Sequence, residues 1–175
     1  MRGVSIAISS SGRPEFLQRA VVCALGQRGV EFEVVVVEQG GVPTPLPPEV
    51  RYYWLPEAHV GRARNLSWQV SRGELLLFLD DDVECRPDLA RGHWVHYLQD
   101  PSRGALAGLM IPQSWGQRDL ALAFWRQQFP QGNYHWMPTG NLSVPRRVME
   151  ELGGFDPHLS HACEDSELTL RIRLR

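Results

Sequence analysis

The segment Glu74-Leu-Leu-Leu-Phe-Leu-Asp-Asp-Asp82 decides the fold of this sequence. Its unbroken apolar run is typical of a parallel strand that is covered on both faces. Three aspartates follow the run directly, and in open α/β sheets ligands bind beyond the carboxyl ends of the strands. The segment therefore predicts a central strand with a ligand site at its end.

The first forty residues indicate one βαβ unit. A strand is expected over Val4 to Ser9, followed by a turn-rich stretch and by Pro14, which suits the first turn of a helix. From there, apolar residues recur at helical spacing as far as Leu25. A second apolar run, Phe32 to Val37, predicts a parallel strand joined to the first by a right-handed crossover.

The alternation of strands and helices continues along the sequence. We expect a short strand over Val50 to Leu55 and a helix over Gly61 to Val70. A helix is predicted from Pro87 through Leu98, and a strand around Ala105 to Ile111. This order predicts an α/β fold with a mostly parallel central sheet.

The end of the sequence fits two kinds of structure. Leu168, Leu170, Ile172 and Leu174 alternate as in a strand, whereas Leu170 and Leu174 also fit one face of a helix. The sequence then stops at Arg175 without a capping or turn signal. We therefore expect a fold that is truncated or unusually short, and the length fits one domain.

The composition is that of an ordinary globular domain, with 43% hydrophobic and 22% charged residues and a formal net charge of −2. This balance gives no indication of a nucleic-acid partner or of a polybasic membrane anchor. No apolar stretch approaches the ~20 residues of a transmembrane helix, and no signal peptide is recognisable. Three cysteines without CxxC spacing argue against a disulfide framework. We expect a cytoplasmic protein, a location that is compatible with peripheral contact with a membrane.

The aspartates Asp80, Asp81 and Asp82 need a partner, because neighbouring carboxylates repel one another and lose solvation when they are packed. Their oxygens suit Mg²⁺ or Mn²⁺, which bind through one or two carboxylates together with substrate phosphates. The alternative is a solvated turn in which Asp82 or Asp88 caps a helix. Because the cluster follows a buried strand, a metal site is the favoured interpretation.

Other polar groups each fit two roles. Glu164 and Asp165 suit either the acidic first turn of a helix or a general base. Arg64, near the start of an expected helix, suits a diphosphate clamp or an ordinary surface position. Gly140-Asn141 suits a structural turn or an amide placed in a pocket. From the residues alone these alternatives stay open.

A series of motifs resembles, in order, those of the family 2 glycosyltransferases, and the resemblance covers nearly the whole sequence. The motifs are Val4 to Leu17, Val34-Val-Val-Val-Glu38, Gly61-Arg-Ala-Arg-Asn65, Phe78-Leu-Asp-Asp-Asp82, Gly140-Asn141 with Arg146-Arg147, Gly153-Gly154-Phe155-Asp156, and Glu164-Asp165 with Leu168 and Arg171. The fourth is similar to the family's D-x-D element. The resemblance implies the GT-A fold, a Rossmann-like α/β/α sandwich, in a single domain. Residues 1–100 would form its nucleotide-sugar-binding half and residues 101–175 its acceptor-binding half.

The resemblance also implies a divalent metal, Mn²⁺ or Mg²⁺, as cofactor. Asp82 would be the principal metal ligand, with Asp80 beside it at the metal or the ribose. Asp165 would deprotonate the acceptor hydroxyl in a single displacement that inverts the anomeric centre. The implied donor-binding residues are Ser9, Glu38, Arg64, Asp80, Asp81, Gly140 and Asn141, and the implied acceptor-side residues are Glu164 and Trp136.

The implied partners are a UDP-, GDP- or dTDP-linked sugar and a carbohydrate or lipid-linked acceptor, the latter meeting the aromatic segment Gln113 to Trp136. Two features depart from the family's pattern: Glu38 replaces the usual aspartate, and Ser-Ser-Ser-Gly-Arg13 replaces the usual Pro-Thr-Tyr-Asn loop. Two alternatives remain. One is a nucleotidyltransferase, although Ser9 to Pro14 lacks the glycine-rich basic loop which that class requires. The other is a non-catalytic module that binds a nucleotide sugar or a glycan.

Overall fold

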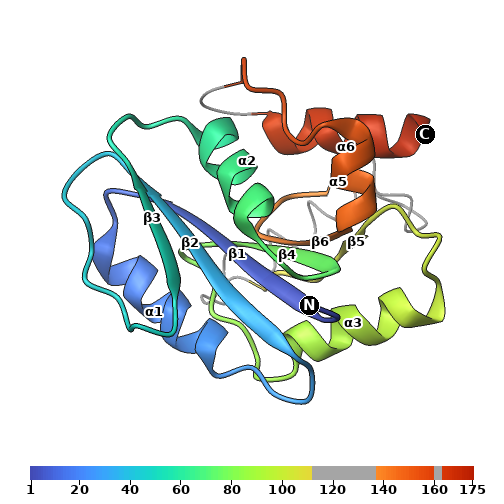
Figure 1. The fold of residues 1–175 in the computed structure, drawn as a ribbon, viewed down its shortest axis with the longest axis horizontal. Coiled ribbons are helices and arrows are strands. Elements are labelled where there is room, and N and C mark those ends of the chain that lie inside the picture. Colours follow the sequence, from blue (N-terminus) through green and yellow to red (C-terminus); the bar gives the residue numbers. More distant parts are fainter. Residues whose placement is uncertain (112–136, 160–162) are drawn as a thin grey trace.

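The computed structural model describes residues 1–111, 137–159 and 163–175. In these residues a six-stranded sheet with the order β3-β2-β1-β4-β6-β5 lies between two layers of helices (Figure 1). The strands are β1 (Val4–Ser11), β2 (Phe32–Gln39), β3 (Arg51–Leu55), β4 (Leu75–Asp80), β5 (Leu106–Ala107) and β6 (Asn141–Pro145). The helices are α1 (Pro14–Leu25), α2 (Val60–Val70), α3 (Leu89–Gln99), α5 (Arg146–Leu152) and α6 (Glu164–Leu174). The predicted α/β sandwich with a mostly parallel sheet is confirmed.

The first βαβ unit forms as its sequence predicts. Pro14 opens α1, where its missing N–H costs no hydrogen bond and its fixed φ suits the helix. β1 pairs in parallel with β2 on one side and with β4 on the other. The apolar run Leu75–Leu79 is therefore central and buried along its whole length.

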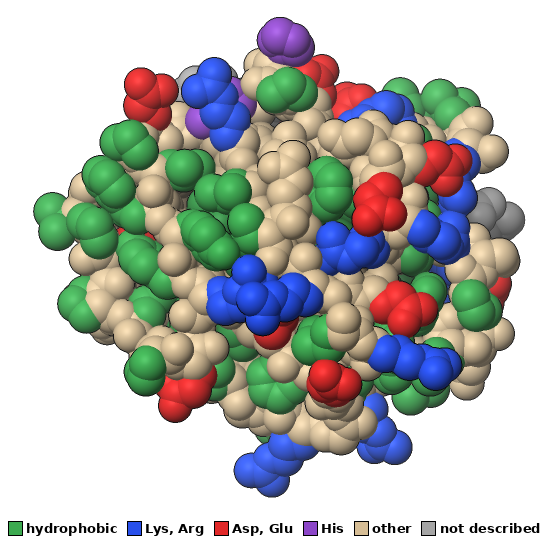
Figure 2. All heavy atoms as spheres, viewed as in Figure 1, with side chains coloured by type: hydrophobic (Ala, Val, Ile, Leu, Met, Phe, Trp, Pro, Cys, Tyr) green, Lys and Arg blue, Asp and Glu red, His purple; other side chains and the backbone are tan. Residues whose placement is uncertain are grey.

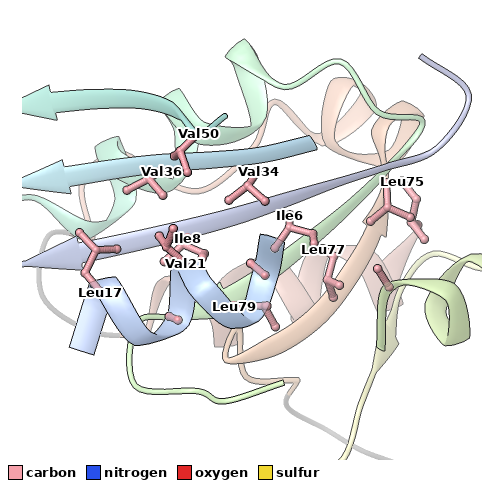
Figure 3. Close-up of a cluster of buried hydrophobic side chains, with 14 residues drawn as sticks. Ile6, Ile8, Leu17, Val21, Val34, Val36, Val50, Leu75, Leu77 and Leu79 are labelled. Carbon is pink, nitrogen blue, oxygen red and sulfur yellow. The ribbon is translucent and has the colours of Figure 1, made fainter. Parts of the chain in front are cut away.

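Two hydrophobic cores lie on opposite faces of the sheet. Because side chains alternate along a strand, Ile6 and Leu77 point to one face, whereas Ala7 and Phe78 point to the other. The first face packs against α1, as Leu17 and the labelled strand residues show in Figure 3. The second face packs against α5 and α6. The side chains at the centre of each core are almost fully buried, so truncation of one leucine there should cost about 2–5 kcal/mol.

The predicted strand over Ala105 to Ile111 is wrong in extent, because only Leu106–Ala107 pair with β6. Beyond Ala107, the N–H of Gly108 still donates to the carbonyl of Asn141 at 2.8 Å, and a Cβ at Gly108 would lie 2.2 Å from Asn141 Nδ2. β6 itself was not predicted. It runs antiparallel to β4 and β5, and it begins at Asn141, within the Gly140-Asn141 pair for which a turn and an amide placed in a pocket had both been considered.

The ambiguous C-terminal stretch is helical. α6 carries the acidic residues Glu164, Asp165 and Glu167 in its first turn, and Arg171 and Arg173 in its last. Both charges complement the helix dipole, and Leu168 is fully buried on the inner face. These contributions outweigh the local strand-like alternation. The aromatic segment Gln113 to Trp136, which precedes α6 in the sequence, lies outside the described residues.

The surface of the domain mixes charges of both signs. Figure 2 shows acidic and basic side chains interspersed on the face that it presents, without a continuous basic region there. No helix in the described ranges is long and apolar enough to cross a membrane.

Candidate functional site

The carboxyl edge of the sheet collects polar side chains from four strands. In the parallel register, Ser9 of β1 lies opposite Asp80 of β4, and Ser10 lies opposite Glu38 of β2. On the other side of β4, β6 begins at Asn141, beside the end of β4. Motifs that are far apart in the sequence therefore meet at one edge, where α/β sheets bind ligands.

The three aspartates after β4 have three different environments. Asp81 is completely buried, and Ser10 Oγ donates a hydrogen bond to its Oδ2 at 2.5 Å. The side chains of Asp80 and Asp82 are 40% and 46% exposed. Asp81 therefore points into the fold, and Asp80 and Asp82 are the partly exposed carboxylates of the cluster. The predicted donor contact of Asp81 would require this buried network to open.

Arg13, in the loop between β1 and α1, holds the buried aspartate. Its Nε donates to Asp81 Oδ2 at 3.2 Å and its Nη2 contacts Asp81 Oδ1, an arrangement that occupies both carboxylate oxygens. Its Nη1 makes a single contact with Asp82 Oδ2, also at 3.2 Å, between two half-exposed side chains. The pair with Asp81 is structural, whereas the contact with Asp82 is easily exchanged.

The pKa values of the two inner aspartates are both raised. For Asp80, burial is the main cause, the charges of Asp82 and Asp165 add to it, and Arg64 opposes it. For Asp81, burial again raises the pKa, while Ser10 and Arg13 oppose the rise. The aspartates at the carboxyl edge of the sheet therefore carry more negative charge than Arg13 and Arg64 neutralise. Such an excess is typical of a site that binds a cation.

Arg64 of α2 links the end of β4 to the start of α6. Its Nη2 donates to Asp80 Oδ1 at 3.1 Å, and its Nη1 pairs with Glu164 Oε1 at the start of α6. The side chains of Arg64 and Glu164 are both nearly buried. The guanidinium that was predicted to clamp a diphosphate is thus engaged by two carboxylates, and the phosphate contact stays a prediction. Glu164, predicted on the acceptor side, is the buried partner of this arginine.

Asp165 interacts electrostatically with Asp80 even though 85 positions separate them in the sequence. Its negative charge contributes to the raised pKa of Asp80, which places the two carboxylates in one electrostatic site. Its Oδ1 accepts hydrogen bonds from the backbone N–H of Ser166 at 2.7 Å and from Ser166 Oγ at 3.3 Å. No described residue donates to its Oδ2, so one oxygen remains available to a substrate.

Asn65 positions the segment that leads to α6. Its Nδ2 donates to the carbonyl of Phe155 at 2.8 Å, and its Oδ1 accepts from the N–H of Phe155 at 2.8 Å. Gly154 fits tightly here, because a Cβ would lie 2.4 Å from Asn65 Oδ1. The Arg64-Asn65 segment therefore fixes both Glu164 and the turn before it.

Glu38 is almost fully buried at the end of β2. It accepts hydrogen bonds from Thr44 N at 2.8 Å, Thr44 Oγ1 at 2.7 Å and the Tyr52 hydroxyl at 2.6 Å. In this conformation Glu38 holds the loop after β2. The contact with a base that was predicted for it stays a prediction, and it requires that loop to move.

Gly140 and Asn141 line the other side of Asp80. A Cβ at Gly140 would lie 2.6 Å from Met110 Sδ and 3.0 Å from Asp80 Oδ2, so this glycine allows both side chains to pack closely against the backbone. The side chain of Asn141 turns to the opposite face, where its Oδ1 lies 3.0 Å from Nε2 of the buried His93. His93 also lies 2.8 Å from Ser143 Oγ, and burial lowers its pKa to about 4. Asn141 is therefore anchored by His93, and the donor contact that was predicted for it stays a prediction.

The exposed carboxylates at this edge are candidate ligands for a divalent metal ion. Among the described residues, no group of three or more His, Cys, Asp or Glu side chains is placed so that it could hold a metal ion by itself. Two partly exposed carboxylates do face outward, and no described residue donates to Asp80 Oδ2 or Asp82 Oδ1. Mg²⁺ and Mn²⁺ take one or two carboxylates and complete their shells with water and phosphate oxygens. The donor set of Asp80 and Asp82 therefore fits such an ion together with a phosphate ligand.

Space for a ligand lies next to Asp82. A hollow is lined by Asp82, Leu89, Leu109, Met110 and Asn141, among other residues. It opens between the loop after β4 and the segment after β5, so a molecule there would reach the outward carboxylate of Asp82. Ser9, at the end of β1, is partly exposed beside Asp80 and completes the other side of the edge.

The residue that sequence reasoning missed is Arg13, which was considered only as part of a loop. Its signal was present: a cation directly after the strand that pairs with β4 is brought to the acidic cluster by the parallel register. Trp136, predicted on the acceptor side, lies outside the described residues.

A mostly parallel sheet with paired carboxylates at the end of its central strand, and a further acid brought to them by the last helix, defines an α/β domain of the nucleotide-sugar-dependent transferase type. A family model described as glycosyl transferase family 2 matches residues 5–149. The chain belongs to this family. The match ends before α6, so the assignment of Asp165 depends on the geometry described above.

Relatives and solved structures are similar to this chain. The O-antigen biosynthesis protein RfbC of Myxococcus xanthus is 27% identical over 200 residues, covering 97% of this chain and 16% of RfbC. The mannosyltransferase PcManGT of Pyrobaculum calidifontis, solved with GDP-Man and Mn²⁺, superposes with a TM-score of 0.75 at 19% identity, covering 98% of this chain and 52% of PcManGT. S. aureus TarS 1-349, solved with UDP, gives 0.74 at 16% identity, covering 99% and 55%. The chain therefore spans about half the length of these structures, whose likeness shows the shared fold.

Proposed function

We propose that this domain transfers a sugar from a nucleotide-diphosphate sugar to an acceptor hydroxyl, in a metal-dependent single displacement with inversion. The observation that carries the proposal is the bridge that Arg64 makes between Asp80 and Glu164, which brings the next residue, Asp165, to the carboxyl edge of β4. One end of the site would hold the donor and the other would activate the acceptor. Membership of the family and the nucleotide-sugar complexes of PcManGT and TarS support this assignment.

The charge of the site supports the need for a metal. Asp80, Asp82 and Asp165 face a ligand, while Arg13 and Arg64 are engaged by Asp81 and Glu164. A diphosphate brought to this edge would meet net negative charge, and such repulsion is strong in a partly buried site. Mn²⁺ or Mg²⁺, held by Asp82 and Asp80, would neutralise the phosphates and stabilise the charge of the departing nucleoside diphosphate.

The chain's own residues would perform the remaining steps. Gly140 lies against Asp80 and Met110, and Ser9 offers a hydroxyl at the same edge. Asp165, whose Oδ2 receives no hydrogen bond from the described residues, would take the proton as the acceptor oxygen attacks the anomeric carbon. Ser166 orients the carboxylate through Oδ1. A single base and no protein nucleophile are required, so the anomeric centre inverts.

A donor screen tests this proposal. Wild type would be incubated with GDP-mannose, UDP-GlcNAc and dTDP-linked sugars in the presence of Mn²⁺, with nucleoside diphosphate release as the readout. We expect release from one class of donor, abolished in Asp165→Asn and retained in Asp100→Asn, an exposed carboxylate at the end of α3. Tight donor binding without release in any wild-type reaction would instead identify a non-catalytic binding module.

A further inference from the structure

Two cysteines lie side by side next to the site, although they were interpreted as unpaired thiols. Cys23 is on α1, and Cys85 is in the loop that joins β4 to α3. Cys23 Sγ donates a hydrogen bond to the carbonyl oxygen of Cys85 at 2.9 Å and accepts one from the backbone N–H of Cys85 at 2.5 Å, so the two side chains lie next to each other. The remaining cysteine, Cys163, is exposed just before α6.

The loop that carries Cys85 is fastened against α1. Gln27 Nε2 donates to the carbonyl of Arg86 at 2.7 Å and approaches Cys85 Sγ at 3.3 Å. Gln27 Oε1 accepts the N–H of Ala90 at 2.8 Å, and the N–H of Arg28 donates to the carbonyl of Pro87 at 2.8 Å. These bonds fix the loop against α1 and therefore keep Cys85 next to Cys23.

The pair is accessible and asymmetric. Both thiols are partly exposed and line a surface hollow with Phe16, Val22 and Glu84. The hydrogen bond from Cys85 lowers the pKa of Cys23 to about 7, against the opposing effects of burial and of Glu84. The shared bond with Cys23, together with burial, raises the pKa of Cys85. Cys23 is thus the more acidic thiol of the pair, and its thiolate is the expected nucleophile.

We propose that Cys23 and Cys85 form an oxidative modification site that closes reversibly to a disulfide in response to a peroxide. The Cys23 thiolate attacks the peroxide oxygen, the O–O bond breaks, and Cys23 becomes a sulfenic acid as hydroxide leaves. Cys85 then attacks the Cys23 sulfur, loses its proton to the departing hydroxide, and water is released. Overall, two thiols and one hydrogen peroxide give one disulfide and two waters, and a dithiol reductant restores the thiols.

The disulfide would tie the loop after the acidic cluster to α1. Cys85 follows Asp82 by three residues, so a covalent bond at Cys85 would restrict the segment that carries the outward carboxylate. Closure of the thiol pair does not depend on the proposed transferase activity. Only the effect of closure on donor binding rests on that proposal.

The test uses a Cys163→Ser variant, which leaves the pair as the sole cysteines. We expect a small excess of hydrogen peroxide to remove two hydrogen masses from the intact protein, a change that dithiothreitol reverses. A proteolytic peptide linking Cys23 to Cys85 would identify the bond. The additional substitution Cys85→Ser should stop the reaction at a sulfenic acid on Cys23 that dimedone traps. The additional substitution Cys23→Ser should leave Cys85 largely unlabelled.

The expected selectivity is large enough to decide the matter. A thiol with a pKa near 7 is about half ionised at neutral pH, against a few per cent for an ordinary thiol, so alkylation of Cys23 should exceed that of Cys85 roughly tenfold. Absence of the disulfide under conditions that oxidise glutathione would overturn the proposal. Equal dimedone labelling of Cys23 and Cys85 in the two single-thiol variants would overturn the assigned order of attack.

Discussion

Carboxylates at the two ends of the parallel strands have opposite environments. At the amino end, Glu33 of β2 accepts hydrogen bonds from Ser5 Oγ at 2.6 Å, from Arg51 at 2.7 Å and from the N–H of Arg72. These bonds lower its pKa even though burial raises it. At the carboxyl end, the pKa of Asp80 is raised.

The difference separates structural from functional charge. Each oxygen of Glu33 has a donor within the fold, so this carboxylate is complete without a ligand. Asp80 and Asp82 each keep an oxygen that no described residue satisfies, and their mutual repulsion is only partly offset by Arg13 and Arg64. Charge that the fold leaves uncompensated at one edge is what a metal and a diphosphate would complete.

The largest expected effect follows from removing the proposed base. Asp165→Asn keeps the shape and the hydrogen bond to Ser166 but cannot take a proton. We expect kcat to fall roughly 10²–10⁴-fold, the usual contribution of general base catalysis. The donor Kd should change little, as measured by calorimetry. The removal of Glu33 by Glu33→Gln, at the opposite edge, should leave kcat nearly unchanged, and equal losses in both variants would contradict the division between the edges.

The next effect concerns stability. Arg64→Met leaves Glu164 buried without its partner, and breaking a buried ion pair from one side costs about 3–5 kcal/mol. Arg62→Met is the matched control, because the pair of Arg62 with Glu57 is exposed and should contribute no more than about 1 kcal/mol. Urea unfolding measures both. The link between the two halves would be refuted if the two variants lost the same free energy of unfolding.

A smaller effect is expected on metal-dependent binding. Asp82→Asn removes the proposed principal ligand, so the enhancement of nucleoside diphosphate affinity by Mn²⁺ should fall by about tenfold or more. Asp81→Asn should lower stability, because it loosens the bonds to Ser10 and Arg13, while most of the Mn²⁺ enhancement remains. Calorimetric titrations with and without Mn²⁺ distinguish these outcomes. A larger loss of the Mn²⁺ enhancement in Asp81→Asn than in Asp82→Asn would show that Asp82 is not the principal metal ligand.

The smallest effect is a difference in pH dependence. Because the folded pKa of Asp80 is raised, the stability it contributes is present below its unfolded value of 3.8 and is lost as pH rises through the folded pKa. The folded pKa of Glu33 is lowered, so its contribution is present above 4.5 and is lost as pH falls. Relative to wild type, Asp80→Asn should therefore gain stability as pH rises and Glu33→Gln should lose it. Unfolding curves from below 3.8 to neutral pH measure the signs, and the same sign for both would contradict the comparison.

Much of this arrangement could be predicted from local sequence, and the exceptions have physical causes. The long apolar runs of β1, β2 and β4 are nearly sufficient to define parallel strands, which is why the site at the end of Leu75–Asp80 could be located. β5 is a two-residue edge strand and β6 lies between β4 and β5, and the antiparallel pairing of both depends on tertiary contacts that local sequence does not reveal. The helical state of α6 follows from its charge pattern and from the burial of Leu168, which alternation alone does not reveal.

The candidate site was predicted unevenly for similar reasons. Asp80 and Asp82 face outward as expected, because a residue's position after a strand fixes which edge it joins. Which carboxylate is satisfied by the fold depends on distant partners, such as Arg13 for Asp81 and Thr44 for Glu38. Those partners are set by register and loop geometry, so the roles of Asp81, Glu38 and Asn141 could not be derived from spacing.

The central claim is that one metal-binding site at the carboxyl edge joins the two halves of the domain. The most direct test is NMR of the labelled protein titrated with Mn²⁺ and a nucleoside diphosphate, because the paramagnetic ion broadens signals from nearby amides. We expect broadening for Gly12, Asp82, Gly140 and Ser166, with the signals of Glu33 and its neighbours retained. Broadening at the amino edge, or at Asp82 without any effect on Gly140 and Ser166, would contradict the account.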